Sequence, residues 1–418
     1  MELTKVKLGD YLEEFGDGIH GTPNYDENGE YYFINGNNLD NGAILIDSET
    51  KRISSDEYDS IKRNLNNRTL LLSINGTLGR LAYYNGENIA LGKSACFLNF
   101  KENTDRRYFR YILEMKDFRL YMSKVASGST IKNFSPRQAA DYEFFAPKPD
   151  DQKKIASVLS ALDDKIALNK KMNQKLEAMA KRLYDYWFVQ YDFPDKNGHP
   201  YKTTGGPMTY NPTLKREIPA GWEVVDINEL CQVVDCLHSK KPDFCYEDEN
   251  SYLLALENIT KEGYIDLSDK YYISKKDFAE WTSRICVREN DFLFTNAGRA
   301  GDMGMVPEGV LCAIGRNITA VRPEKINPWY LRCFFKSLYM QEQILNNLDQ
   351  GSFFMSFNVR SIKKLQVLMP SELLMKKFIS FVEPHLKRIE KNNKEISRLT
   401  KLRDKLLPLL MNGQVEVK

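Results

Sequence analysis

Two segments of the chain carry apolar residues at alternating spacings of four and three, a pattern typical of long helices that pair along a seam. The first begins near Asp150, an acidic residue suited to a helix N-terminus, and the second loses the alternation near Arg403. The seam positions are Ile155, Leu159, Leu162, Ile166, Asn169, Asn173, Leu176, Ala180 and Leu183, then Phe378, Val382, His385, Ile389, Asn392, Ile396 and Leu399. We therefore expect long helices over residues 150–189 and 371–418. The alternative is two independent helices, each packed on its own domain.

Polar residues interrupt this seam at Asn169 and Asn392, which occupy equivalent positions of the two segments. A buried asparagine in a seam usually fixes the partner and the register of the helices, at some cost in stability. These two residues therefore favour a specific pairing of the helices.

Short runs of β-prone residues bounded by Gly, Asn and Asp precede each helical segment. Examples are EYYFING and RTLLLSING before the first segment, and NSYLLAL and DFLFTNAG before the second. A few helical stretches follow in each region, which predicts a mixed α+β domain over residues 1–149 and another over 221–370. Residues 190–220 are rich in Pro and Gly and lack periodicity, so they are expected to form a linker or an extended connector.

The two regions also align with each other. YYFINGNNL at residue 31 matches SYLLALENI at residue 251, an offset of 220, and GSTIKNFSPR at residue 128 matches GSFFMSFNVR at residue 351, an offset of 223. Because the order is kept and the offset drifts by only a few residues, we infer an internal duplication. The expected fold is α+β, with two similar mixed α/β domains separated by two long helices.

Composition adds a few limits. A chain of 418 residues is too long for one core, and 42% hydrophobic residues supply enough material for two. No long apolar run or signal-peptide pattern occurs, and seven irregularly placed cysteines suit reduced thiols in a cytoplasm. A net charge of +2 argues against a uniformly basic coat but permits local basic faces.

Three strings resemble a known family. IPAGWEVVDINEL (218–230) is similar to the start of a target-recognition domain. KRLYDYWFVQYDFPDKNG (181–198) is similar to the end of a central helical region, and DKLLPLLMNGQV (404–415) is similar to the C-terminal end of that family's chains. Together with the order of domains and helices, they make essentially the whole chain resemble the specificity subunit of type I restriction-modification enzymes.

The resemblance implies a non-catalytic DNA-binding subunit with a pseudo-twofold internal repeat. Each domain would read one half of a bipartite target in double-stranded DNA, and the two antiparallel helices would form a coiled coil that sets the spacer. Two methyltransferase subunits would dock on the helices, joined by restriction-translocase subunits. S-adenosylmethionine, and ATP with Mg, would belong to those partners.

Reading bases requires polar side chains on loops, and phosphates require Lys, Arg and backbone amides. The loops between the predicted strands supply both kinds. The expected DNA-binding residues are His20, Thr22, Asn24, Asn75, Thr77, Arg80, Lys93, Thr130, Lys132 and Asn133 in the first domain, and Ser239, Lys240, Lys241, Asn296, Arg299, Arg316, Asn317 and Ser352 in the second. For each, the simpler interpretation is a hairpin turn or a solvated lysine. Phe134 and Phe357 are expected to be core anchors rather than base-stacking residues.

No pattern predicts catalytic residues or a metal centre. NPWY (327–330) lacks the second Pro of a methyltransferase loop, and no Gly-rich cofactor loop accompanies it. GRAGDMG (298–304) lacks the Lys of a P-loop. The spacing of Cys231, Cys236, His238 and Cys245 matches no common zinc module. The alternatives left open are a coiled-coil scaffold whose domains bind protein, and a self-contained modification enzyme.

Overall fold

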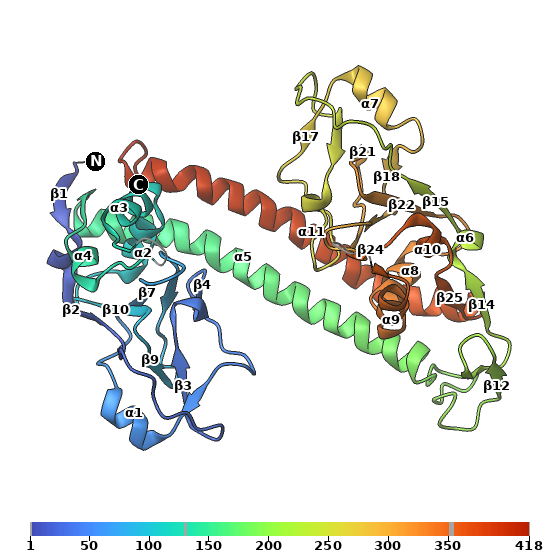
Figure 1. Ribbon diagram of the computed structural model, residues 1–418, viewed down its shortest axis with the longest axis horizontal. Helices are drawn as coiled ribbons and strands as arrows, with labels where there is room; N and C mark the ends of the chain where they lie inside the picture. The colour runs from blue at the N-terminus through green and yellow to red at the C-terminus, as the bar shows by residue number, and fades with distance from the viewer. Residues whose placement is uncertain (1, 129–131, 351–354, 418) are drawn as a thin grey trace. The chain divides into compact units, whose positions relative to one another are not determined.

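The computed structural model describes residues 2–128, 132–350 and 355–417. The chain forms two compact units (Figure 1): unit 1 comprises residues 1–167 and 398–418, and unit 2 comprises residues 168–397. No helix in the described ranges has the length and apolar content needed to cross a membrane.

Unit 1 contains a β-rich domain followed by the first half of a long helix. Its elements are β1 (Thr4–Lys7), β2 (Leu12–Asp17), β3 (Tyr31–Ile34), β4 (Leu39–Asp40), β5 (Ala43–Ile44), β6 (Arg52–Ile53), α1 (Ser55–Ile61), β7 (Thr69–Ser73), β8 (Leu81–Tyr83), β9 (Ile89–Leu91), β10 (Ala95–Phe100), α2 (Arg106–Glu114), α3 (Lys116–Val125), α4 (Pro136–Ala140), β11 (Glu143–Ala146) and the start of α5 (Pro149–Tyr184). Two short 3-10 turns, η1 (Leu8–Tyr11) and η2 (Gly36–Asn38), follow β1 and β3.

Unit 2 repeats most of this order of elements after a short hairpin. Its elements are a π-helical turn (Asp185–Val189), β12 (Met208–Asn211), β13 (Arg216–Pro219), β14 (Glu223–Asp226), α6 (Ile227–Leu230), β15 (Cys231–Asp235), β16 (Tyr252–Leu254), the 3-10 turn η4 (Leu256–Asn258), β17 (Tyr271–Tyr272), α7 (Lys275–Trp281), β18 (Val287–Arg288), β19 (Phe292–Thr295), β20 (Met303–Met305), β21 (Leu311–Ile314), β22 (Ile318–Pro323), α8 (Pro328–Phe335), α9 (Leu338–Asn346), β23 (Asp349–Gln350), β24 (Met355–Ser356), α10 (Val359–Lys363), β25 (Gln366–Met369) and the start of α11 (Glu372–Met411).

The strand order confirms the duplication. The main sheet runs β2-β10-β7-β8 in unit 1 and β15-β22-β19-β20 in unit 2, and the pairs β1-β11 and β14-β25 are also equivalent. In both units a second sheet contains one parallel pair, β3 with β9 and β16 with β21. The expected α+β class, with two similar domains and two long helices, is therefore correct.

The corner that follows α3 and α9 shows why the repeated sequence folds in the same way twice. Ser135 caps α4 by accepting a hydrogen bond from the amide of Gln138, and Asn358 caps α10 by accepting one from the amide of Ser361. Phe134 and Phe357 precede these caps and are fully buried, as expected of core anchors.

The long helices α5 and α11 pack together (Figure 1). In unit 2, Asn392 Nδ2 donates to Asn173 Oδ1 at 2.8 Å, and Asn169 Nδ2 donates to Glu395 Oε2 at 2.9 Å, which fixes an antiparallel register. In unit 1, the end of α11 joins the hydrophobic core that contains Ile155 and Leu159. Every seam position expected from the sequence is buried or half-buried.

Residues 190–222, most of which were expected to form a linker or an extended connector, fold onto unit 2. Strands β12 and β13 pair in an antiparallel hairpin. Phe193 stacks on Tyr201 and on Trp222, with ring centroids 4.5 and 5.3 Å apart. The Pro and Gly residues therefore supply turns, while the aromatic residues between them supply buried surface.

Candidate nucleic-acid interface

In unit 1, three loops that are distant in sequence meet where the strands of the main sheet end. The amide of Ile74 donates to the carbonyl of Ser94 at 3.0 Å, and the amide of Phe134 donates to the carbonyl of Ile74 at 2.8 Å. Asn75 also forms an isolated antiparallel β-bridge with Asn133. The predicted residues on the turn 75–80, at Lys93 and at 132–133 therefore lie on one surface, whereas Thr130 lies outside the described residues.

Unit 2 builds the same junction with equivalent hydrogen bonds. The amide of Asn296 donates to the carbonyl of Asn317 at 2.7 Å, and the amide of Phe357 donates to the carbonyl of Asn296 at 2.8 Å. The exposed Arg316 and Asn317 thus lie beside the turn that follows β19. Ser352 lies outside the described residues.

The turn that follows β7 or β19 has one backbone conformation in both units. Gly76 and Gly79 have φ of +73° and +83°, and the equivalent Gly298 and Gly301 have +80° and +89°. These values lie in the left-handed region that glycine adopts without a steric penalty. The turn therefore has the same backbone in both units but carries different side chains, Thr77 in unit 1 and Arg299 in unit 2.

Two of the predicted arginines hold neighbouring loops in this structure. Arg80 Nη1 donates to the carbonyl of Asn37 at 3.2 Å. Arg299 Nη2 donates to the carbonyls of Leu256 and Ile259 at 2.7 and 2.6 Å. Arg80 therefore binds the 3-10 turn η2, and Arg299 binds the 3-10 turn η4 and the residue after it. Both arginines position the loops of the candidate interface.

The first predicted loop of each unit is anchored to the same junction. The amide of Gly18 donates to the carbonyl of Ala95 at 3.2 Å, and the amide of Cys236 donates to the carbonyl of Ile318 at 3.2 Å. The side chains beyond these anchors are mostly exposed. They are His20, Thr22 and Asn24 in unit 1, where Asn24 donates to Glu57, and Ser239, Lys240 and Lys241 in unit 2, where Lys241 Nζ lies 3.6 Å from the Tyr271 ring centroid.

The chain is similar in sequence to several known proteins. Residues 2–178 match the family model described as "Type I restriction modification DNA specificity domain". The chain is 25% identical over 322 residues to the type I restriction enzyme MjaIX specificity subunit of Methanocaldococcus jannaschii, covering 76% of this chain and 71% of that protein. It is 20% identical over 371 residues to the HindI specificity subunit of Haemophilus influenzae, covering 76% of each.

A solved structure supports the fold over nearly the whole chain. The S subunit of a type I restriction-modification system from M. genitalium superimposes with a TM-score of 0.62 at 18% identity, covering 98% of this chain and 96% of that one. The family model matches the first repeat, and the equivalent strand order extends the likeness to the second. The first repeat of the chain therefore carries a type I restriction-modification DNA specificity domain, and the chain as a whole is similar to the specificity subunits of these systems.

A specificity subunit is the DNA-recognition component of its system and belongs to a non-catalytic family. The NPWY string agrees with this assignment, because it forms an ordinary helix start. Asn327 caps α8 by accepting a hydrogen bond from the amide of Trp329 at 2.9 Å, and Pro328 occupies the first turn.

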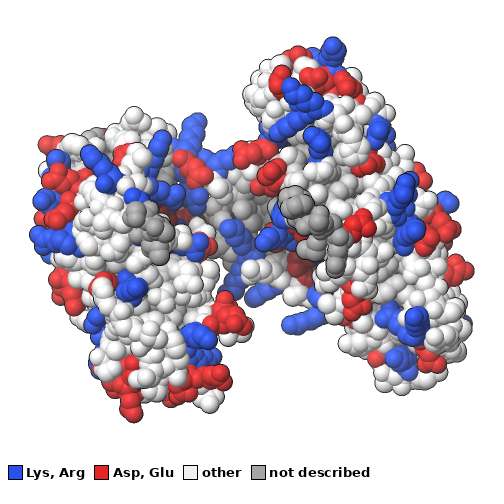
Figure 2. Space-filling view, viewed as in Figure 1, with Lys and Arg blue, Asp and Glu red and all other residues white. Residues whose placement is uncertain are grey.

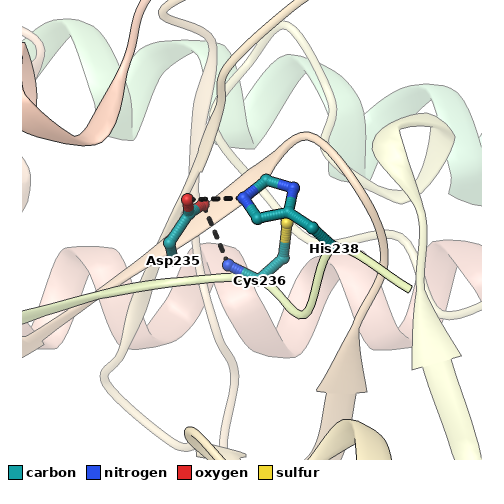
Figure 3. A group of neighbouring side chains, drawn as sticks. All are labelled: Asp235, Cys236 and His238. Atoms are coloured by element: carbon teal, nitrogen blue, oxygen red, sulfur yellow. Dashed lines mark hydrogen bonds and ion pairs between the residues drawn. The ribbon is translucent and has the colours of Figure 1, made fainter.

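One cluster of potential metal ligands occurs in the described part of the chain, formed by Asp235, Cys236 and His238 (Figure 3). The Asp235 carboxylate already has protein partners on both oxygens. Oδ2 pairs with His238 Nε2 at 2.8 Å, and Oδ1 accepts from the amide of Cys236 at 3.0 Å. Burial raises the pKa of the Cys236 thiol, which disfavours the thiolate that a metal requires. The arrangement therefore fits a hydrogen-bonded support better than a metal centre, and Cys231 and Cys245 do not belong to it.

An exposed aromatic patch in unit 2 was missed in the sequence. The side chains of Phe244 and Tyr246 are 63% and 62% exposed, and they follow Lys240 and Lys241 in the loop after β15. The available signal was the string SKKPDFCY, in which two lysines are followed closely by two aromatic residues, since aromatic and basic side chains together are typical of nucleic-acid surfaces. On the face drawn in Figure 2, basic and acidic side chains are mixed over each unit.

Proposed function

We propose that each unit of this specificity subunit reads one half of a bipartite target in double-stranded DNA. The observation that carries the proposal is the duplicated junction of loops, whose backbone is the same while its side chains differ. Lys93 in unit 1 is replaced by Arg316 in unit 2, and Ser94 by Asn317. A common scaffold with different donors and acceptors is what two different half-sites require.

In this proposal residues 1–149 and 221–370 are the target-recognition domains, and residues 190–220 connect them. The side chains on the duplicated junction divide into DNA contacts and positioning residues. The proposed contacts are His20, Thr22, Asn24, Asn75, Thr77, Lys93, Lys132 and Asn133 in unit 1, and Ser239, Lys240, Lys241, Asn296, Arg316 and Asn317 in unit 2. Arg80 and Arg299 act as positioning residues because their guanidinium groups bind carbonyl oxygens.

The paired helices set the unread spacer between the half-sites. Helix α5 has 36 residues and α11 has 40. A rise of about 1.5 Å per residue makes α5 about 54 Å long, a length that corresponds to about 16 base pairs of duplex. In a target reader, helices of this length can set the distance between the two half-sites that are read.

The outer faces of the helices dock two methyltransferase subunits. Leu373 and Phe381 lie eight residues apart on one face of α11 and are exposed, although both are apolar. Restriction subunits join this assembly in the cytoplasm. S-adenosylmethionine and ATP with Mg bind to these partners, so the chain itself supplies recognition and assembly.

The test is methylation mapping in cells that express the chain with its methyltransferase. We expect a split, asymmetric motif with an unread gap. Asn75→Ala should relax the sequence preference in one half of that motif only, and Asn296→Ala should relax it in the other half only. A continuous motif, or variants that alter both halves equally, would contradict the assignment of one half-site to each unit.

A further inference from the structure

The two units share a side-chain pair in the loop that is anchored to the duplicated junction. In unit 1, His20 Nε2 lies 2.9 Å from Asp17 Oδ2, and in unit 2, His238 Nε2 lies 2.8 Å from Asp235 Oδ2. Asp17 ends β2 and Asp235 ends the equivalent β15. The offset is the same for both members, since 235 − 17 and 238 − 20 each equal 218. The pair therefore occupies one site of the repeat.

The neighbouring residues of the loop differ, although the pair is kept. The loop is DGIHG in unit 1 and DCLHS in unit 2, so Gly18 is replaced by Cys236. A pair required only for folding would be expected in the core, yet the side chains of His20 and His238 are 75% and 59% exposed. Each imidazole is held in place at one nitrogen and is open to solvent elsewhere.

The carboxylate determines which hydrogen-bonding group the imidazole presents. An ionised aspartate only accepts hydrogen bonds, so the Nε2 that faces it carries the hydrogen. In the neutral imidazole the other nitrogen, Nδ1, is then an acceptor. In the major groove, adenine N6 and cytosine N4 are the donors, whereas guanine presents O6 and N7 as acceptors.

We propose that His20 and His238 are direct base-reading residues, one in each unit, whose Nδ1 accepts a hydrogen bond from the exocyclic amine of an adenine or a cytosine. Asp17 and Asp235 are their positioning residues. This inference rests on the proposed function, because it assigns one base contact within each half-site.

The surroundings of the pair support this placement. The amide of Ile19, next to His20, donates to the carbonyl of Leu91 at 2.9 Å, which holds the loop against the turn that carries Lys93. In unit 2 the link is direct, because Asn296 Nδ2 lies 3.4 Å from Asp235 Oδ1. The positioning aspartate of unit 2 thus touches a turn that is itself proposed to read DNA.

The experiment uses the complete complex of the chain with its methyltransferase and measures binding to duplexes that carry its mapped target. Each adenine or cytosine of the target is replaced singly by the analogue that lacks the exocyclic amine, purine or 2-pyrimidinone. The wild-type complex should lose about tenfold in affinity at one position of each half-site, the effect of one base contact. His20→Ala should be insensitive to the analogue at that position in one half-site, and His238→Ala in the other.

The positioning role has its own readout. In Asp17→Asn the amide group can donate to the ring, which favours the tautomer with a hydrogen on Nδ1. The preference at the same position should then shift toward a base with acceptors, guanine or thymine, while the other half-site is unchanged. A purely structural role for Asp17 would instead lower affinity for every sequence equally. His199→Ala, which removes an exposed imidazole outside both proposed readers, is the matched control and should alter neither half-site.

The outcomes separate this inference from the proposed function. If the wild-type target is split but His20→Ala and His238→Ala keep every base preference, the inference is wrong and the proposed function stands. Equal loss of affinity for all sequences would assign the histidines to phosphates and would also overturn it. A wild-type complex without a split target would overturn the proposed function itself.

Discussion

Arg110 and Arg332 occupy equivalent positions of α2 and α8, and each is buried against a carboxylate of the same long helix. Arg110 Nη1 lies 3.2 Å from Asp163 Oδ2, and Arg332 Nη2 lies 2.6 Å from Glu177 Oε1. The arginine side chains are only 8% and 2% exposed, and both carboxylates belong to α5. In unit 1 the arginine therefore binds the helix of its own repeat, whereas in unit 2 it binds the helix of the other repeat.

The two ion pairs join each domain to α5. The β-rich domain of each unit is attached to the long helices by an ion pair with a buried arginine, as well as by apolar packing. In unit 1, Arg403 of α11 completes the contact by binding Asp163 Oδ1 at 2.9 Å. A subunit that presents loops to DNA requires such fixed attachment, because a small rotation of a domain would misplace its contacts.

Replacement of Glu177 should destabilise unit 2 strongly. Glu177 Oε2 lies 3.1 Å from Lys336 Nζ, and Tyr264 also donates to this carboxylate. In Glu177→Gln the buried Arg332 and the half-buried Lys336 and Tyr264 therefore lose a charged partner. Removing one member of a buried pair leaves the other charge uncompensated and costs about 3–5 kcal/mol. Urea denaturation of the purified chain measures the difference in unfolding free energy.

The matched control is Glu372→Gln on α11, where the lost partner is the exposed Lys376. This variant should unfold like the wild type, since exposed ion pairs contribute little. Equal effects of the two substitutions would show that the Glu177 cluster does not anchor the domain.

The stability conferred by Glu177 should also depend on pH. Burial alone would raise the pKa of Glu177, but Arg332 and Lys336 lower that pKa below the usual value of a glutamate. A carboxyl group with a lowered folded-state pKa stabilises the fold above its unfolded pKa of about 4.3 and loses this contribution as the pH falls through the folded value. The difference in unfolding free energy between wild type and Glu177→Gln should therefore be constant from neutral pH to about pH 5 and shrink below about pH 4. A difference that persists unchanged in acid would contradict the ion-pair explanation.

The features that the sequence predicted are those encoded by local periodicity or by the duplication. The seam from Ile155 to Leu183 predicted α5 because one apolar stripe on a helix requires that spacing. The alignment of GSTIKNFSPR with GSFFMSFNVR predicted equivalent corners, which the helix caps of Ser135 and Asn358 confirm. Each of these signals can be recognised in a short stretch of sequence.

Features that depend on contacts between distant residues were not predictable in this way. Arg299 binds the carbonyl of Leu256, 43 residues away, so its role in holding a loop has no local signature. The folding of residues 190–222 depends on Trp222, which follows the Pro- and Gly-rich stretch, and on its packing against Phe193. The duplicated pair of Asp and His became evident only when the structure placed both members at the end of equivalent strands.

The buried pair of Asn173 and Asn392 should specify the register of the helices rather than stabilise them. The residue equivalent to Asn173 in the second repeat is Ile396, at an offset of 223, so this pair breaks the symmetry of the repeat. Asn392→Leu alone should destabilise the chain by about 1–3 kcal/mol, because the buried Asn173 Oδ1 is left without a hydrogen-bond donor. The double variant Asn173→Leu with Asn392→Leu should recover the loss and exceed wild-type stability.

Urea denaturation of the four proteins of this double-mutant cycle measures the coupling between the two asparagines. Their complexes with the methyltransferase should then be assayed on a library of target spacers. The double variant should accept a wider range of spacer lengths than the wild type, since the polar register signal is gone. Additive stability effects, with an unchanged spacer preference, would remove the register role from this pair.

Salt dependence should distinguish the DNA-binding subunit from a scaffold whose domains bind protein. Lys93 and Arg316 are exposed at equivalent turns of the two junctions, where they can neutralise phosphates. Each substitution, Lys93→Ala or Arg316→Ala, should weaken binding of the complex to DNA and reduce the slope of log affinity against log salt concentration by about 1. Titrations at several salt concentrations measure this slope, and Lys62→Ala, an exposed lysine paired with Asp59 on α1, serves as the control with an unchanged slope. A protein-binding scaffold would show no such slope in the presence of DNA, because counterion release from phosphates is what produces it.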